Sequence, residues 1–323
     1  MKKVLVTGAN GFLGRRLVEQ LLARGHAVRA FVLPGEAVPA HWSGRVELRR
    51  GDLTDAAAVT DAAAGMDAVV HLAALVGDGH TRAAQQRVTV GGTQNVVEAA
   101  RRHRCHVILA SSICAYGDHL QRGACPEDTP YGRPQGTYGW AKQRQEAVLR
   151  TLDPSAWTII RPANIYGPGC KPWLEEAGAA LRQGLPVIIG DGRGNAGLTY
   201  VDNVAELFCA ALEQPAARGR VYNACDELEV SWAQYFSDLA RLLGTPPPKR
   251  APRLAVRLLA LLAPPLWRLL RRRDRPPITR EAYNLVGSDH RIPAERARRE
   301  LGWTPRMSYA DGMQAVAQSL RGS

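Results

Sequence analysis

Residues 2–32 read KKVLVTGANGFLGRRLVEQLLARGHAVRAFV, and this stretch decides the fold class. A β-branched run over residues 2–6 enters a turn that contains Gly8, Gly11 and Gly14, and apolar residues then recur at helical spacing. The pattern predicts a strand, a glycine turn, a helix and a second strand. Glycine lets the backbone turn tightly and lets a pyrophosphate approach the positive end of the helix. Because the triplet lies between a strand and a helix, it favours dinucleotide binding over a purely structural turn.

Strands and alanine-rich helical segments continue to alternate through the first half of the chain. Apolar runs over residues 46–48, 68–70 and 107–110 lead into "GDLTD", "HLAA" and "SSICAYG". This alternation predicts an α/β fold with a doubly wound parallel sheet. Ligands bind such a sheet beyond the carboxyl ends of its strands, so the residues that follow these runs are candidates for a site.

Several side chains fall at those strand ends. Asp52 could accept a hydrogen bond from an adenine amine, and the small Ala73 and Ala74 would let the backbone approach a cofactor. His71 is predicted to be a buried structural histidine rather than a catalyst. Ser112 follows the third run and can donate a hydrogen bond to a substrate carbonyl.

The stretch "TYGWAK" carries a second candidate group. Tyr138 and Lys142 are four residues apart, so on a helix they share one face. An ammonium beside a phenol favours the phenolate, which predicts a lowered pKa for Tyr138. Together with Ser112, these groups can move a proton while hydride moves to or from a nicotinamide. A Tyr-x-x-x-Lys pair also arises by chance on helix surfaces, so the assignment depends on the motifs around it.

Six motifs in order decide between these alternatives. "TGANGFLG", "GDLTD", "HLAA", "SSICAYG", "YGWAK" and "RPANIYGPG" resemble the extended short-chain dehydrogenase/reductase superfamily, the group of NAD-dependent epimerases and dehydratases. The later "TYVDNVAE" and "ELGWTPRMSYADGM" extend the resemblance over essentially the whole chain. The resemblance implies a Rossmann-type sheet and a catalytic triad of Ser112, Tyr138 and Lys142. It also implies that Lys142 binds the nicotinamide ribose, that residues 162–165 lie against the nicotinamide, and that Asn164 faces the substrate.

The resulting set of site residues has two parts. The expected cofactor-binding residues are Gly8, Asn10, Gly11, Phe12, Leu13, Gly14, Asp52, Leu53, Leu72, Ala73, Ala74, Tyr138, Lys142, Pro162 and Ile165. The expected substrate-binding residues are Val76, Ser112, Tyr138 and Asn164.

The chain departs from the family pattern at two places. Where the family has Asn in "NVxGT", this sequence has Thr89 in "TVGGT", which puts any relay or helix-bending role of that Asn in question. The second strand has neither an acid near Val32, as NAD-preferring relatives do, nor an arginine near Leu33, as NADP-preferring ones often do. A 2′-phosphate needs a cation more than a 2′-hydroxyl needs an acid, so NAD is favoured slightly over NADP. Arg15 or Arg29 could reverse that preference.

Beyond "RPANIYGPG" the regular alternation stops. The resemblance implies a dinucleotide-binding domain over residues 1–167, to which segments at about 191–221 return. Residues 168–323 would then form mainly a smaller, discontinuous substrate-binding domain.

The stretch "GDGRGNAGLTYVDN" bears on the branch of the family. Nucleotide-sugar enzymes commonly have a diphosphate-binding arginine at the position that Ala196 occupies here, and Arg193 could replace it only if the loop is rearranged. The "TYVDNVA" spelling and the late leucine- and proline-rich segment before "PPITR" look more like the 3β-hydroxysteroid dehydrogenase-like branch. We therefore expect an NAD(P)-dependent oxidoreductase that interconverts an alcohol and a ketone on an apolar molecule, sterol-, isoprenoid- or polyketide-like, with Tyr138 as general acid/base.

Two other functional classes remain open. One is a nucleotide-sugar epimerase or dehydratase with tightly held NAD. The other is a non-catalytic, redox-sensing NAD(P)-binding protein, which would be expected to lack Tyr138 or Lys142.

Residues 253–273, RLAVRLLALLAPPLWRLLRRR, are the most apolar stretch of the second half. Arg257 and the Pro264-Pro265 pair interrupt the stretch, which argues against a membrane span. We expect it to cover an apolar substrate site, with an ordinary amphipathic helix pair and a peripheral membrane contact as alternatives. In the membrane alternative, Arg268 and residues 271–273 would face lipid phosphates. The leucines concerned are Leu254, Leu258, Leu261, Leu262, Leu266, Leu269 and Leu270.

Composition sets the remaining expectations. The 323 residues are 46% hydrophobic, enough for a sizeable core. Only five of the 42 basic residues are lysine and no nucleic-acid motif accompanies the +12 charge, so we expect a solvated basic surface and no nucleic-acid partner. The six cysteines lack metal-binding spacing, and no apolar region of secretory length follows Met1, so we expect a cytoplasmic protein without a metal. The sequence is compatible with a homodimer.

Overall fold

A computed structural model describes residues 1–270, 276 and 278–321. Its centre is a seven-stranded sheet in the order β3-β2-β1-β4-β5-β6-β10, and every neighbouring pair is parallel. The strands are β1 (Lys3–Thr7), β2 (Ala27–Val32), β3 (Val46–Arg50), β4 (Ala68–His71), β5 (His106–Ala110), β6 (Trp157–Pro162) and β10 (Arg220–Ala224). The strand order reverses between β1 and β4, which confirms the predicted doubly wound sheet.

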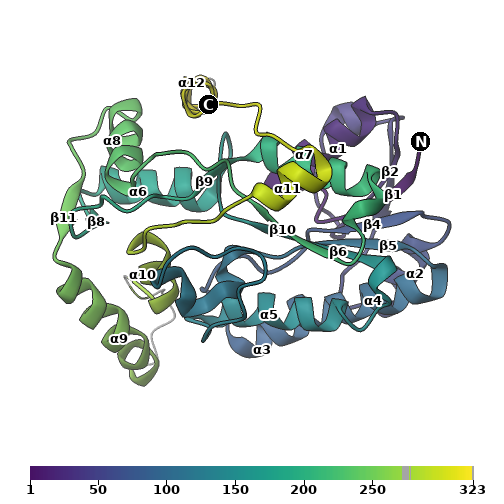
Figure 1. Cartoon of the computed structure of the whole chain (residues 1–323), viewed down its shortest axis with the longest axis horizontal. Coiled ribbons are helices and arrows are strands. Elements are labelled where there is room, and N and C mark those ends of the chain that lie inside the picture. The colour runs from purple at the N-terminus through teal and green to yellow at the C-terminus, as the bar shows by residue number, and fades with distance from the viewer. Residues whose placement is uncertain (271–275, 277, 322–323) are drawn as a thin grey trace.

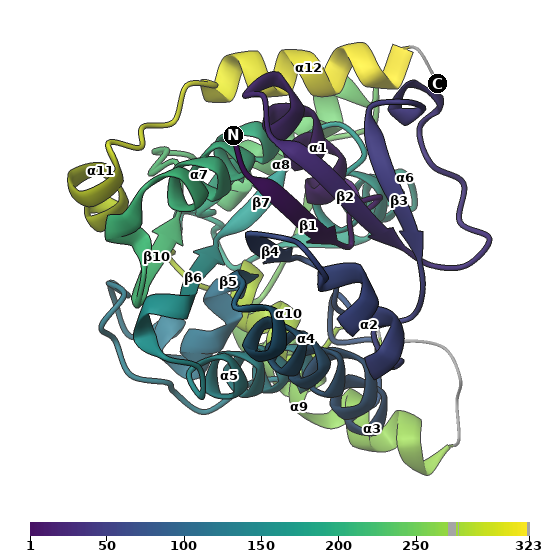
Figure 2. The ribbon, with the colours of Figure 1, turned by 90° about the vertical axis from the view of Figure 1, so that its right-hand side faces the viewer.

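Helices cover both faces of this sheet (Figure 2). One layer contains α1 (Phe12–Ala23), α7 (Val201–Glu213) and α11 (Glu295–Leu301), and the other contains α2 (Ala56–Ala63), α4 (Gly91–His103) and α5 (Thr137–Leu149). Because both faces are covered, the inner strands β1, β4 and β5 are nearly continuous buried runs, whereas the edge strand β3 is largely exposed.

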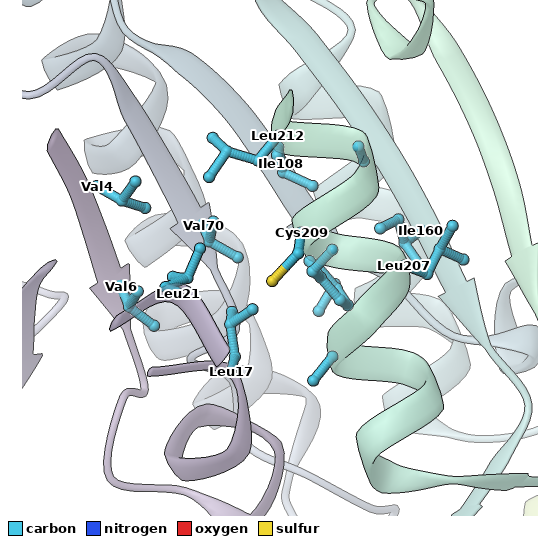
Figure 3. Close-up of a cluster of buried hydrophobic side chains, with 14 of the residues drawn as sticks. Val4, Val6, Leu17, Leu21, Val70, Ile108, Ile160, Leu207, Cys209 and Leu212 are labelled. Carbon is cyan, nitrogen blue, oxygen red and sulfur yellow. The ribbon is translucent and has the colours of Figure 1, made fainter. Parts of the chain in front are cut away.

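The largest core cluster lies between the sheet and helices α1 and α7 (Figure 3). Val4 and Val6 of β1 point into this cluster, whereas Leu5 between them points to the opposite layer. Leu17 and Leu21, one turn apart on α1, meet Cys209 of α7 there, and all three are fully buried. This packing fixes α1, and with it the glycine turn that precedes the helix.

The chain beyond β6 alternates between the large sheet and a smaller assembly at one end of the molecule (Figure 1). Two small parallel sheets pair β7 with β9 and β8 with β11. The helices and strands that belong neither to the large sheet nor to its two helix layers are β7 (Asn164–Tyr166), α6 (Ala177–Arg182), β8 (Pro186–Ile189), β9 (Leu198–Tyr200), α8 (Trp232–Leu242), β11 (Lys249–Ala251), α9 (Arg253–Leu269), α10 (Arg280–Val286) and α12 (Tyr309–Arg321).

Short helical segments connect these elements. Four are 3₁₀ segments, η1 (Ala40–Trp42), η3 (Ile113–Gln121), η4 (Pro154–Ala156) and η6 (Pro215–Ala217), and two are π-helical, η2 (Gln85–Val90) and η5 (Lys171–Glu176). A single turn, α3 (Arg82–Ala84), precedes η2.

Helix α9 contains the Pro264-Pro265 pair and exposes most of its leucines. Its buried side consists of small residues, Val256, Ala260 and Ala263. The leucines at positions 254, 258, 262, 266, 269 and 270 are exposed, and Leu261 is half-buried. The arginines at 271–273 lie outside the described residues. Among the helices that the structure describes, none combines the length and the apolar character needed to cross a membrane.

Candidate active site

The glycine turn connects β1 to α1 at the switch point of the sheet. Gly8 has a φ of +68°, and the Gly11 amide donates to the Gly8 carbonyl at 3.0 Å. A side chain on Gly14 would lie 2.2 Å from the Gly8 oxygen, so helix α1 begins directly on the turn. Near Gly11, by contrast, the only described atom within 4 Å of an added Cβ would be the Gly8 oxygen, at 3.2 Å. The turn therefore leaves open space beside the exposed Gly11 backbone at a helix N-terminus, which fits a dinucleotide pyrophosphate.

The "HLAA" turn after β4 packs directly against this glycine turn. A side chain on Gly8 would lie 2.8 Å from the Ala73 amide, and that amide donates to Thr7 Oγ1 at 3.3 Å. His71 Nδ1 lies 2.7 Å from Thr7 Oγ1, and Nε2 lies 3.0 Å from Thr93 Oγ1. Burial lowers the pKa of His71 to about 3, so the ring is neutral. The predicted structural role of His71 is confirmed.

Asp52 lies just beyond the end of β3. Its Oδ1 accepts hydrogen bonds from the amide and hydroxyl of Thr54, both at 2.8 Å, and these bonds hold its pKa below the usual value. The following Leu53 is buried against Gly92 of α4. The contact of this pair with adenine stays a prediction.

The three proposed catalytic residues come together beyond the carboxyl end of β5. Ser112 follows β5, and its Oγ accepts from the Cys114 amide at 3.1 Å. Lys142 lies on α5, where its Nζ donates to the Ala110 carbonyl at 2.8 Å and is 5.4 Å from the Tyr138 ring centroid. Lys142 is almost fully buried, and burial lowers its pKa to about 8.

The charge state of Tyr138 differs from the sequence-based expectation. Burial raises the pKa of the Tyr138 phenol well above its ordinary value, and a hydrogen bond with Ser112 offsets only part of that rise. The prediction of a lowered Tyr138 pKa is wrong for the described site, because burial raises this pKa and Lys142 Nζ donates to the Ala110 carbonyl. At neutral pH Tyr138 is therefore a protonated phenol, the form that can donate a proton.

Helix α5 is fixed to the sheet by an ion pair that the sequence analysis missed. Arg161 of β6 donates to both oxygens of Glu146, with Nε–Oε1 at 2.9 Å and Nη2–Oε2 at 2.7 Å. Ser111 and Tyr131 donate to the same carboxylate, and both charged side chains are essentially inaccessible to solvent. Two features of the sequence could have indicated this ion pair: an arginine within the apolar run of β6, and a glutamate four residues after Lys142.

The Thr89 departure leaves the helix bend in place. Thr89 lies in the π-helical segment η2 that leads into α4. Its hydroxyl donates to Gln85 Oε1 at 2.7 Å and accepts from the Leu75 amide at 3.1 Å. The Thr89 carbonyl accepts from Thr93, which connects the bend to His71. Thr89 therefore supplies the side-chain hydrogen bonds of the bend. The bend forms without the Asn of the family pattern.

The expected nicotinamide and substrate residues lie at the start of the second half. Asn164 is buried in β7, where its Nδ2 donates to the Ala196 carbonyl at 2.7 Å. Pro162 ends β6 and Ile165 is half-buried beside Asn164, whereas Val76 is exposed in the loop after β4. Asn164 thus acts as a link between β7 and the loop before β9, and substrate contact by Asn164 or Val76 stays a prediction.

Comparison with known proteins places this geometry in a family. A model of the NAD dependent epimerase/dehydratase family matches residues 4–225. The chain belongs to this family. It is an NAD(P)-dependent oxidoreductase of the extended short-chain dehydrogenase/reductase type.

Individual proteins match the chain over nearly its full length. The 2-alkyl-3-oxoalkanoate reductase of Stenotrophomonas maltophilia is 32% identical, with 98% of this chain and 99% of that protein covered. The decarboxylating sterol-4-alpha-carboxylate 3-dehydrogenase of Homo sapiens is 29% identical, with 99% of this chain and 88% of that protein covered. The structure of MoeE5 in complex with UDP-glucuronic acid and NAD is 26% identical, with a TM-score of 0.76 and 99% of both chains covered.

An acid that the sequence analysis did not name, Glu36, lies at the end of β2 beside Asn10 of the glycine turn. Leu33 to Glu36 form a tight turn, in which the Glu36 amide donates to the Leu33 carbonyl at 3.2 Å and Gly35 has a φ of +76°. The turn carries the Glu36 carboxylate back to the end of β2, where it accepts from the Leu33 amide at 3.1 Å and from Asn10 Nδ2 at 2.8 Å. The structure therefore has an acid near the end of the second strand, contrary to the expectation from the sequence. The Pro-Gly pair at the centre of "LPGE" is the signal that could have shown the turn.

The arginines considered for a 2′-phosphate have other partners. Arg29 is bound to Glu47 and to two carbonyls of the α2 segment, whereas Arg15 binds the carbonyl and side chain of Asn10. Arg50 donates to the carbonyls of Leu33 and Glu36. Glu36 is thus the group that can accept from a ribose 2′-hydroxyl, and its charge opposes a 2′-phosphate.

We predict that Glu36→Gln shifts the ratio of NADP to NAD affinity towards NADP by about tenfold or more, because it removes a like charge and leaves Arg15 and Arg50 in place. Both dissociation constants can be measured by titration calorimetry. Asp61→Asn, at an exposed acid on α2, is the matched control and should leave the ratio unchanged. An unchanged ratio for Glu36→Gln would show that the ribose lies elsewhere.

Proposed function

We propose that the protein interconverts an alcohol and a ketone on an apolar small molecule, exchanging a hydride with NAD(P). The observation that carries the proposal is the cluster of Ser112, Tyr138 and Lys142 at the end of β5, two strands from the glycine turn. The names of the relatives support the substrate class, since an alkylated oxoalkanoate and a sterol are both largely hydrocarbon.

Each residue of the cluster has one task in the proposed reaction. Tyr138 donates its phenol proton to the carbonyl oxygen during reduction and accepts a proton during oxidation. Ser112 donates a hydrogen bond to the same oxygen, and Lys142 binds the nicotinamide ribose. When bound, the nicotinamide supplies or accepts the hydride. The raised pKa of Tyr138 suits the direction of ketone reduction, because the phenol keeps its proton until a carbonyl oxygen gains charge.

A nucleotide-sugar substrate is the alternative, and the similarity to MoeE5 makes it worth testing. Two observations disfavour it. Ala196, the position at which nucleotide-sugar enzymes commonly have an arginine, is fully buried, and its amide donates to the Val230 carbonyl. Arg193 is 88% exposed and 3.7 Å from Asp191, so it does not form a preorganised diphosphate clamp.

We propose the following division of labour along the chain. Residues 1–167 and the returning segment at about 191–221 bind the dinucleotide, and the rest of 168–323 mainly binds the substrate. We also propose a cytoplasmic location, which is supported by six cysteines that are all free and buried.

Helix α9 is the proposed apolar cover of the substrate site. Its small residues Val256 and Ala260 pack against Tyr283 of α10, so α9 is attached to the helix next to the catalytic cluster. Leu262 and Leu266 are exposed, which leaves an apolar surface available to a hydrocarbon substrate. A membrane surface and a second copy of the chain are the two alternative partners of this surface, and an experiment must distinguish them from a substrate.

The function is tested by a panel of substrates with either NADH or NADPH. A 2-alkyl-3-oxo acid and an apolar cyclic ketone should be reduced, and UDP-glucose should be neither epimerised nor oxidised. Tyr138→Phe should lower turnover by about 10²–10⁴-fold with little change in dinucleotide affinity, because only the proton donor is removed. Turnover of UDP-glucose without ketone reduction would refute the proposal, as would wild-type turnover by Tyr138→Phe.

Replacing Leu262 and Leu266 with serine should raise KM for an apolar ketone more than it changes NAD affinity. A fully buried leucine contributes roughly 1.5–3 kcal/mol, so even partial contact with substrate is measurable. Leu242→Ser, at an exposed leucine of α8, is the control. Wild-type KM in the double variant would remove the substrate role. If the double variant no longer sedimented with anionic vesicles as the wild type does, the surface would be assigned to membrane contact. If the wild type were a dimer in gel filtration and the double variant were not, the surface would be assigned to a second copy of the chain.

A further inference from the structure

Glu281, on the short helix α10, touches the catalytic helix from the C-terminal part of the chain. It is 4% exposed, and its Oε1 accepts from the Gly139 amide at 2.7 Å. Gly139 lies in the first turn of α5, directly after Tyr138. Within the described residues, Oε2 of Glu281 has no hydrogen-bond partner. A carboxylate thus lies at the N-terminus of the helix that carries the proposed proton donor, an arrangement that the helix dipole favours.

Two glycines of "QGTYG" make room for this carboxylate. A side chain on Gly136 would place its Cβ 1.9 Å from Glu281 Oε2, and one on Gly139 would lie 3.1 Å from Oε1 and 2.8 Å from the Cys114 carbonyl. Any side chain at 136 would therefore displace Glu281 from the helix end. The glycines of "QGTYG" and Glu281 of α10 together allow this close approach, although the two segments are about 140 residues apart in the chain.

The groups around Glu281 come from three other elements. Asp78, in the loop after β4, accepts a hydrogen bond from Thr279 and repels the Glu281 charge. Cys114 of η3 and Tyr138 of α5 complete the surroundings. Burial and Asp78 raise the pKa of Glu281 to about 7, and the Gly139 amide opposes that rise. Glu281 in turn raises the pKa of Tyr138, because a negative charge disfavours a nearby phenolate.

We propose that Glu281 is a positioning residue that docks α10 on the catalytic helix and places its carboxylate at the first turn, next to Tyr138. This rests on the proposed role of Tyr138 in proton transfer. Because Tyr283, two residues further along α10, packs on α9, the same helix connects the proposed substrate cover to the proton donor. The leucine-rich helix and the catalytic residue are thereby joined through one carboxylate.

The test compares Glu281→Gln with Glu281→Ala. Glutamine keeps an oxygen that can accept from Gly139 but carries no charge. It should move the alkaline limb of ketone reduction, and the rise of alcohol oxidation, to lower pH by about one unit. Alanine also loses the hydrogen bond and should lower kcat at every pH, with dinucleotide affinity unchanged in both variants. Glu295→Gln, at an exposed acid in the first turn of α11, is the control and should keep the wild-type profile. A wild-type profile in Glu281→Gln overturns the role of the charge.

Thermal stability gives a second readout that needs no substrate. The folded-state pKa of Glu281 lies above the ordinary value of 4.5, so the protonated carboxyl is favoured in the fold. The stability that this group contributes is complete below about pH 4.5 and is lost as the pH rises to about 7. The Tm of the wild type should therefore fall relative to that of Glu281→Gln over this range. If no ketone is reduced but this difference is present, the proposed function fails and the docking contact stands. Parallel Tm curves for these two proteins, together with an equal Tm for Glu281→Ala, which lacks the hydrogen bond to Gly139, overturn the docking contact.

Discussion

The buried ion pair between Arg161 and Glu146 is the constraint on which the site depends. Both groups are withdrawn from water, and the cost of desolvation is met only because the pair is bidentate and the remaining oxygen lone pairs accept from Ser111 and Tyr131. Glu146 lies one turn after Lys142 on α5, so the pair fixes the distance between this helix and β6. With Glu281 at its first turn, α5 is held by a carboxylate at each end of its catalytic face.

The topology of the sheet explains why a dinucleotide and a carbonyl substrate can meet there. The strand order reverses between β1 and β4, and the glycine turn, the "HLAA" turn and Ser112 follow β1, β4 and β5 in adjacent positions. The hydrogen bonds that join Thr7, His71 and Thr93 fix the floor of this region without contributing a titrating group. The proposed proton transfer is thereby left to Tyr138, whose surroundings raise the pKa of its phenol.

Local patterns in the sequence predict the parts of this structure that depend on local physics. The glycine triplet, the apolar runs and the Tyr-x-x-x-Lys spacing indicate the sheet, the cofactor turn and the shared face of Tyr138 and Lys142. They do not indicate how deeply a side chain is buried, which is why the direction of the Tyr138 pKa shift was predicted wrongly. Glu36 was missed for a different reason, since a tight turn returns a residue from beyond the strand to its end. Glu281 could not be predicted, because nothing in a single sequence connects it to Gly136 across most of the chain.

A double-mutant cycle on Arg161 and Glu146 tests most directly whether this pair holds the catalytic helix. Urea unfolding and kcat would be measured for Arg161→Met, Glu146→Leu and the double variant. Each single change should cost about 3–5 kcal/mol of unfolding free energy, because it leaves one buried charge without its partner. The double variant should recover most of that stability while kcat stays low, because α5 is no longer fixed to β6. Single variants that unfold and turn over like the wild type would contradict this account.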